Sequence, residues 1–229
     1  MPTINADMTI ADVLRISSRT TTVFHEYGLD YCCGGDRVIR DAATEMSINI
    51  PNLLIDLGKA IQTPHSQLDR SDSTAIHPEV AQLSLPDIID HIYMYHHAYI
   101  YAEAPRISHD FTKVVAAHGS KHPYLTKGRD IFNKLHEELM QHLHAEEQSI
   151  FPGIEFGDFT LEDIDKLRTE HNNAGELLVL LRSTMQDYKP PEDACYSFRT
   201  LLEKLLKLET NIFQHISEET AYVFSSAKV

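Results

Sequence analysis

The sequence predicts an all-α protein, in which a small helical domain at the N-terminus precedes an antiparallel four-helix bundle. Glycine is scarce, at 9 of 229 residues, whereas an average usage of roughly 7% would supply about 16. Apolar residues recur at steps of three and four over long segments, which is the pattern of one helix face. Short breaks that contain Pro, Gly or Ser separate these segments. Long helices joined by short loops favour an antiparallel bundle.

Residues 1–61 are expected to form the small domain, from several short helices. Thr9 and Asp12 have the spacing of a capping box in front of an apolar helix face. Gly28 follows the next apolar segment and suits the left-handed residue that ends many helices. Pro51 can occupy the first turn of a last short helix.

A polar stretch separates this domain from the bundle. Residues 62–84 are rich in Ser, Asp, Thr and Pro and show no period, so we interpret them as a linker. Residues 85–229 then carry four long helices. The first should stop at Pro105, and the segment around Phe111 either forms a separate short helix or extends the first. The predicted spans of the long helices are 86–104, 124–150, 160–188 and 193–224.

Charge and targeting signals exclude several classes of protein. The chain carries 20 Lys and Arg against 34 Asp and Glu, a formal charge of −14, which argues against a nucleic-acid or anionic-membrane surface. The N-terminus lacks the basic and apolar regions of a secretory signal, and the apolar runs are far shorter than the roughly 18 residues of a membrane span. Three cysteines, two of them adjacent, do not make a disulfide framework. We therefore expect a cytoplasmic protein that handles cations.

Histidine is the unusual residue of this composition, with 14 copies. A histidine followed four residues later by a carboxylate is a metal-binding spacing, because both side chains share a helix face. By chance, 14 histidines and 34 acids would produce about two such pairs, and three occur. The spacing alone therefore establishes no site.

Each predicted long helix has a seam, which is the line of mainly apolar residues at alternating steps of three and four that faces the core. The residues that interrupt these seams are more informative than the spacing. His142 and Glu146 lie on the seam of the second helix, and His171 lies on the seam of the third. His215 and Glu219 lie on the seam of the fourth. A buried carboxylate without a positive partner is costly, and a bound metal ion is such a partner. These ionisable residues are therefore candidate metal ligands.

The first long helix leaves two candidates open. If the helix face that includes Ile100 lies against the core, His97 is on that face. If the face that includes Ile92 lies against the core, His96 is on it instead. Periodicity favours His97 only slightly.

The donor set predicts the kind of metal. Six nitrogen and oxygen ligands exceed the four of a tetrahedral zinc site. Two glutamates that each bridge two ions, with two imidazoles on each ion, describe a dinuclear centre. Imidazole and carboxylate suit iron or manganese, and open positions on the ions admit dioxygen, nitric oxide or peroxide. Our prediction is two iron ions that are bridged by carboxylates, with room for an oxo bridge.

Five short motifs are spread over nearly the whole chain, at 31–35 (Tyr-Cys-Cys-Gly-Gly), 88–99, 135–152, 170–176 and 215–219. Together they resemble the RIC (repair of iron centres) family of di-iron proteins, which has a short N-terminal domain and a hemerythrin-like four-helix bundle. By position, the resemblance favours His97 over His96 and implies that both glutamates bridge. The implied metal ligands are His97, His142, Glu146, His171, His215 and Glu219. The linker is longer than the family suggests, and Phe224 lacks the usual following Pro, but neither departure touches a ligand.

The resemblance also implies a role, which is the repair of iron–sulfur clusters damaged by nitric oxide or oxidants. The implied partners are damaged iron–sulfur proteins, with nitric oxide or dioxygen as small ligands. A homodimer is a separate expectation, which neither the motifs nor the resemblance supports. Neither nucleic acid nor a membrane is expected as a partner. Two other functions stay open: an enzyme that reduces nitric oxide or peroxide at the same centre, and a hemerythrin-like module that senses O2 or NO. The sequence does not separate these alternatives.

The cysteines form a separate question. Cys32 and Cys33 are adjacent, and a disulfide between neighbours is strained and easily reduced. The two glycines that follow leave the thiols approachable, so we interpret the pair as a redox or iron- and nitric oxide-handling site. The alternative is a structural turn with packed thiols. Cys195, at the start of the fourth helix, is expected to be structural.

Overall fold

The computed structural model of the chain describes residues 4–16, 20–29, 31, 37–62 and 80–224. These residues are helical or irregular, and their only β-type pairing is an isolated antiparallel bridge between Thr9 and Val38. The all-α prediction is therefore confirmed. Most of the predicted linker, residues 63–79, lies outside the described residues, and the predicted domain borders stay a prediction.

Two compact units account for the contacts along the chain. The first combines residues 1–88 with 213–226, and the second consists of residues 89–212 with 227–229. The first unit thus contains the N-terminal helices together with the last turns of the chain's final long helix. No helix among the described residues is sufficiently long and apolar to span a bilayer.

A capping box and a left-handed glycine mark helix ends in the first unit. The Thr9 hydroxyl accepts a hydrogen bond from the Asp12 amide (3.1 Å), and the Asp12 carboxylate accepts one from the Thr9 amide (3.2 Å), which is the predicted capping box. Gly28 has a φ of 69°, the left-handed conformation expected after a helix. The N-terminal helices of this unit are α1 (Ile10–Ile16), α2 (Thr20–Glu26), α3 (Ile39–Glu45) and α4 (Ile50–Gln62).

A shared apolar core joins these short helices to the C-terminal segment. The core contains Phe24 and Tyr31, whose rings stack with centroids 6.3 Å apart. Phe213 lies against the same core, with its ring centroid 5.5 Å from that of Tyr31. Helix α1 also contacts η6 (Glu219–Val223). A domain of about sixty residues buries little surface, so these C-terminal side chains add substantially to its core.

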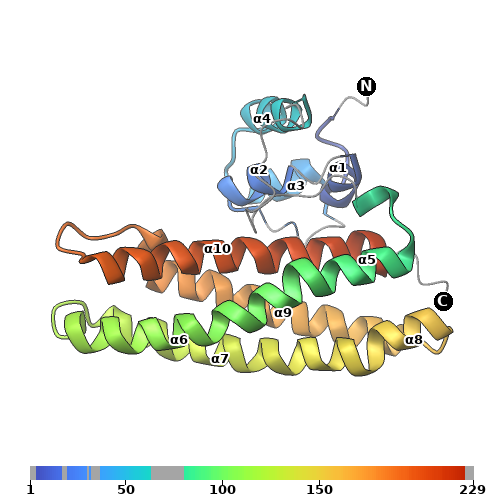
Figure 1. Cartoon of the computed structure of the whole chain (residues 1–229). Helices are drawn as coiled ribbons and strands as arrows, with labels where there is room; N and C mark the ends of the chain where they lie inside the picture. The colour runs from blue at the N-terminus through green and yellow to red at the C-terminus, as the bar shows by residue number, and fades with distance from the viewer. Residues whose placement is uncertain (1–3, 17–19, 30, 32–36, 63–79, 225–229) are drawn as a thin grey trace. The chain divides into compact units, whose positions relative to one another are not determined.

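The second unit is built from long helices, and α6, α7, α9 and α10 run beside one another in Figure 1. Phe111 of α6 and Phe132 of α7 are fully buried between them, with ring centroids 5.5 Å apart. The elements are α5 (Leu85–Ile92), η3 (Tyr93–His97), α6 (Ala98–His118), α7 (Tyr124–Ala145), η4 (Glu146–Ile150), α8 (Phe151–Phe156), α9 (Leu161–Thr184), η5 (Gln186–Tyr188) and α10 (Tyr196–Glu218). This arrangement agrees with the predicted four-helix bundle.

Two proline positions correct the predicted helix ends. Helix α6 continues through Pro105, so the prediction that the first helix stops there is wrong, and the alternative that the segment around Phe111 extends it is confirmed. Pro105 is exposed, where water can bond the carbonyl that loses its partner, while Ile107 and Phe111 keep the opposite face buried. The second helix likewise passes Pro152, because that residue lies in the first turn of α8, directly after η4. The third predicted helix ends earlier than expected, at Thr184.

Three turns of the long helices are π-helical, and periodicity did not predict them. The amide of Ala98 donates to the carbonyl of Tyr93 in η3, and that of Phe151 donates to the carbonyl of Glu146 in η4. In η6 the Phe224 amide donates to the Glu219 carbonyl at 2.9 Å. Each π turn inserts one residue into the helical register, and such turns are frequently found at functional sites.

A glycine allows close packing inside the bundle. A Cβ atom on Gly128 would lie 2.3 Å from the sulfur of Met185, and Met185 is itself buried. Gly58, inside helix α4, offers a matched comparison because a Cβ there would meet nothing within 4 Å. The two positions separate the effect of packing from that of helix propensity.

We expect Gly128→Ala to lower the free energy of unfolding by about 1–3 kcal/mol through overpacking. Gly58→Ala should raise it by about 0.5–1 kcal/mol, since alanine favours a helix interior. Calorimetric unfolding of both full-length variants measures the difference. Equal effects of the two substitutions would contradict the packing explanation.

Candidate metal centre

Four of the predicted ligands meet within the second unit. One oxygen of the Glu146 carboxylate lies 3.3 Å from Nε2 of His97, and the other lies 3.1 Å from Nε2 of His142. Nε2 of His171 lies 3.1 Å from Nε2 of His142. Glu146 is completely buried, and the three imidazoles are almost so. Each oxygen of one carboxylate therefore faces an imidazole from a different helix, which is the arrangement of a bridging ligand.

The other two predicted ligands form a second buried pair. His215 lies in the last turn of α10, and Glu219 is the first residue of η6. Nε2 of His215 lies 2.9 Å from a Glu219 oxygen, and both side chains are fully buried. The pair has the same four-residue spacing as His142 and Glu146.

Among the described residues, three groups of buried side chains could hold a metal ion, and within each group the ligand atoms lie within 4.8 Å of one another. One group, His91, His96 and Glu218, shares no residue with the others. The other two share Glu146 and Glu219, and they are His97, Glu146, His215 and Glu219, and His142, Glu146, His171 and Glu219. Two carboxylates shared between two sets of imidazoles match the donor set of a dinuclear centre.

The charges of the site test whether a metal fits. Removing a carboxylate from water costs several kcal/mol, and Glu146 and Glu219 are both completely buried. Neutral imidazoles satisfy hydrogen bonds but do not neutralise two negative charges. Divalent cations coordinate the carboxylate oxygens directly and neutralise their charge, and nitrogen and oxygen donors suit iron or manganese. The residues present fit the predicted group.

Two further carboxylates hold the imidazoles from outside, and sequence reasoning missed both. An oxygen of Glu147 lies 2.9 Å from Nδ1 of His97, and an oxygen of Glu170 lies 2.8 Å from Nδ1 of His142. A ring that donates from Nδ1 presents its Nε2 lone pair to a metal. The hydrogen bond with His142 lowers the pKa of Glu170 despite the opposing effect of burial. The signal in the sequence was only that each of these acids adjoins a predicted ligand.

Aromatic residues enclose the His97 side of the site. The ring of Phe151 stacks on His97 with centroids 5.8 Å apart, and Tyr93 meets His97 edge-on at 5.4 Å. Burial and the neighbouring Glu147 raise the pKa of Tyr93 to about 12. The same causes raise the pKa of Tyr101 to about 12. Both phenols therefore stay protonated at neutral pH and remain hydrogen-bond donors.

The alternative between His96 and His97 has a structural explanation. Both side chains are buried, at 3% and 1% exposed. His97 contacts Glu146, whereas the ring of His96 lies edge-on to that of His91, with centroids 5.7 Å apart. Both residues lie in the π turn η3. Periodicity treated the two residues as alternatives, whereas the structure buries both.

The structure does not describe the predicted cysteine site. Cys32 and Cys33 lie outside the described residues, so their interpretation stays a prediction. Cys195 is exposed, and its sulfur lies 3.1 Å from Nε2 of His118 at the opposite end of α6 from His97. Nearby, Nε2 of His122 lies 3.2 Å from the Asp193 carboxylate.

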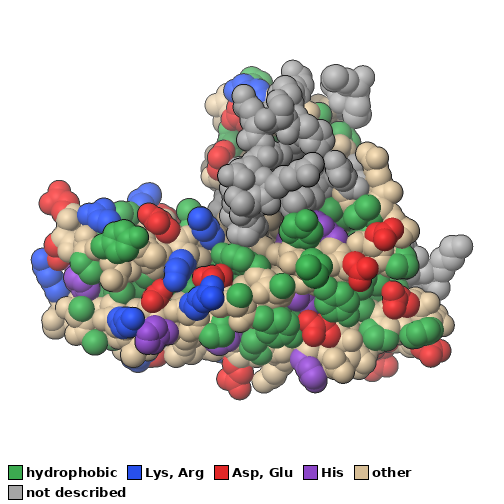
Figure 2. All heavy atoms as spheres, in the orientation of Figure 1, with side chains coloured by type: hydrophobic (Ala, Val, Ile, Leu, Met, Phe, Trp, Pro, Cys, Tyr) green, Lys and Arg blue, Asp and Glu red, His purple; other side chains and the backbone are tan. Residues whose placement is uncertain are grey.

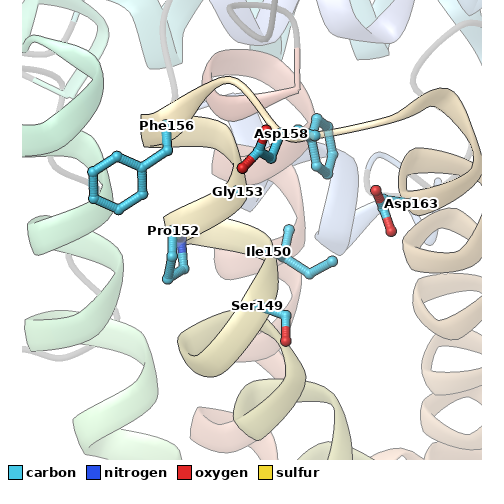
Figure 3. A pocket seen from close by; sticks show the side chains of 8 residues that line it. Ser149, Ile150, Pro152, Gly153, Phe156, Asp158 and Asp163 are labelled. Carbon is cyan, nitrogen blue, oxygen red and sulfur yellow. The ribbon is translucent and has the colours of Figure 1, made fainter.

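A surface pocket and the surface charge add to this picture. The pocket in Figure 3 is formed by residues 149–163, with Asp158 and Asp163 as its acidic groups, and its lining includes none of the six predicted ligands. Figure 2 shows Lys and Arg mixed with Asp and Glu on the left half of the visible face of the bundle, whereas the visible charged side chains of its right half are mainly Asp and Glu, among the residues that the structure describes. The buried histidine and glutamate cluster is thus the stronger candidate site.

Comparisons with known proteins agree with this geometry. Residues 88–227 match the family model of the hemerythrin HHE cation binding domain, and residues 6–61 match that of ScdA_N, a domain of unknown function. The chain is similar to the Iron-sulfur cluster repair protein YtfE of Escherichia coli O1:K1 / APEC, at 29% identity over 224 residues and 96% of each chain. It is also similar to the protein of the same name from Enterobacter sp. (strain 638), at 28% identity over 223 residues and 96% of each chain.

Two neighbouring histidines provide a direct test of the site. His97→Ala should lower the metal content per chain by about half or more, because it removes a donor that faces Glu146. His96→Ala, a substitution of equal size at a buried neighbour, should leave the metal content near that of the wild type. Elemental analysis of proteins loaded anaerobically with ferrous ion provides the measurement. Loss of metal in the His96 variant alone would reverse the assignment.

Proposed function

The chain belongs to the hemerythrin HHE cation binding family, and from this we propose that it is a di-iron protein that takes part in the repair of damaged iron–sulfur clusters. The observation that carries the proposal is the pair of completely buried glutamates, each four residues after a buried histidine. The similarity to relatives named for iron–sulfur cluster repair covers 96% of the chain, so it includes both the N-terminal region and the helical bundle.

The proposed ligands divide between two irons. His97 and His215 bind one ion, His142 and His171 bind the other, and Glu146 and Glu219 bridge the two. The two overlapping groups of ligand atoms support this division. When bound, such a pair of irons supplies redox chemistry and open positions for a small ligand such as nitric oxide or dioxygen.

The protein's own residues prepare and protect this centre. The carboxylates of Glu147 and Glu170 orient the rings of His97 and His142, so that the metal-facing nitrogens are already aligned. Phe151 and Tyr93 pack against His97 and exclude water from that side. Every proposed donor is nitrogen or oxygen, and none is a soft thiolate of the kind that holds iron in iron–sulfur clusters. The site can therefore both bind ferrous iron and release it to such a cluster.

Partners follow from this role. We propose that the chain acts on damaged iron–sulfur proteins, that nitric oxide and dioxygen are its small ligands, and that it works in the cytoplasm as a homodimer. Cys32 and Cys33 would assist from the N-terminal domain by binding iron in transit or nitric oxide. The similarity to YtfE proteins along nearly the full chain supports the repair role.

The proposed function predicts a specific metal content and colour. Wild-type protein loaded anaerobically should contain about two irons per chain, because both carboxylates are shared between two groups of donors. After oxidation, an oxo bridge between the two irons would give oxo-to-iron absorption bands. His142→Ala should lose these bands and at least half of the iron. Wild-type protein that takes up only zinc, or no metal, would refute the di-iron proposal.

A second measurement addresses repair itself. The loaded protein should restore the activity of a hydratase whose [4Fe–4S] cluster has been damaged by nitric oxide, whereas His142→Ala should not. Rapid conversion of nitric oxide to nitrous oxide, without restoration of the hydratase, would favour a reductase instead.

A further inference from the structure

Two outer carboxylates support the imidazoles of the site through nearly identical hydrogen bonds. Glu147 bonds His97 at 2.9 Å, and Glu170 bonds His142 at 2.8 Å. In both cases the bond is made to Nδ1, so each carboxylate controls the direction of one metal-facing nitrogen. The two carboxylates are similarly exposed, at 24% for Glu147 and 31% for Glu170, but the side chains around the two bonds differ.

His97 is held on every side. Its ring lies between Phe151, stacked at 5.8 Å, and Tyr93, edge-on at 5.4 Å, and only 1% of its side chain is exposed. The partner carboxylate, Glu147, also accepts a hydrogen bond from the Tyr101 hydroxyl. Rotation of the His97 ring would break this chain of bonds and disturb two aromatic contacts.

His142 is held less firmly. Its outer partner Glu170 is 31% exposed, and the nearest cation is the Lys166 ammonium, 3.8 Å away on the same helix and 63% exposed. An exposed ion pair of this kind contributes little because water and salt screen it. The ring of His142 meets that of His171 edge-on at 4.8 Å. By turning toward solvent, Glu170 would lose its hydrogen bond to His142 and this weak ion pair, whereas Glu147 would lose its bond with Tyr101 as well as the one to His97.

From this asymmetry we propose that the ion bound by His142 and His171 is the exchangeable one, and that Glu170 is the positioning residue that sets its rate of release. The inference rests on the proposed function, since it requires two bound irons. Its cargo is a ferrous ion, which leaves on the side where α7 and α9 pack together. The ion bound by His97 stays in place while the first is exchanged.

The chemistry of release needs no oxidant or covalent step. When the Glu170 carboxylate turns outward, the His142 ring is no longer fixed and its Nε2 can leave the ion. Loss of an outer hydrogen-bond partner typically weakens metal binding about 10- to 100-fold. Glu147 makes the same bond on the other side and should affect the other ion.

The test measures release of iron from the full chain loaded with ferrous ion, with a coloured chelator in excess. Wild-type protein should release iron in two phases of equal size. Glu170→Ala should accelerate the fast phase about 10-fold or more and leave the slow phase unchanged. Glu147→Ala, the matched variant, should accelerate the slow phase instead. Glu137→Ala, at an exposed acid of α7, should change neither phase.

A conservative variant separates positioning from general destabilisation. Glu170→Gln keeps a hydrogen-bond acceptor for Nδ1, so its fast phase should lie between those of the wild type and Glu170→Ala. Mössbauer spectra of 57Fe-loaded protein, recorded after the fast phase, should show one of two iron environments depleted. Thermal unfolding of the metal-free variants checks that each is folded.

The outcomes distinguish the two proposals. If the wild type does not bind two irons, the proposed function itself fails. If it binds two but releases them in one phase, or if Glu170→Ala accelerates both phases equally, the function stands and the assignment of the exchangeable ion is wrong. Acceleration of the fast phase by Glu147→Ala would reverse the assignment of the two sides.

Discussion

Two carboxylates buried inside a helical bundle are the constraint on which the rest of this structure depends. Glu146 and Glu219 are completely inaccessible to water, and the cost of burying one unneutralised charge is several kcal/mol. Positive charge offsets such a cost, and metal ions held by the neutral imidazoles around Glu146 would supply it. The apolar residues before and after the ligands on each helix pack against one another and hold the ligand-bearing turns in place.

The π turns adapt the helices to this layer. Glu146 and Glu219 each begin a π turn, and His97 ends one. The extra residue of each turn changes which side chains face inward, so that a ligand and neighbouring aromatic residues such as Phe151 are buried together. Because π turns have poorer backbone geometry than α-helix, their presence at three ligand positions points to a functional constraint.

The first unit contributes through the segment that bears His215 and Glu219. Its core includes contact between Tyr31 and Phe213, two residues before His215, and α1 contacts η6, which begins at Glu219. The short N-terminal helices and this segment therefore fold around one apolar core. Their common core links the stability of the N-terminal helices to that of two proposed ligands.

The sequence by itself determined the helices and the candidate ligands on their seams, because residues four apart on an apolar face must be buried together. It therefore identified His142 with Glu146 and His215 with Glu219, and its motifs indicated the family. It did not reveal that the helix passes Pro105, or that His96 and His97 are both buried, since these depend on how the helices pack. Glu147 and Glu170 were also hidden, because their bonds to His97 and His142 join different helices. Contacts of that kind have no period along the chain, and only the tertiary structure decided them.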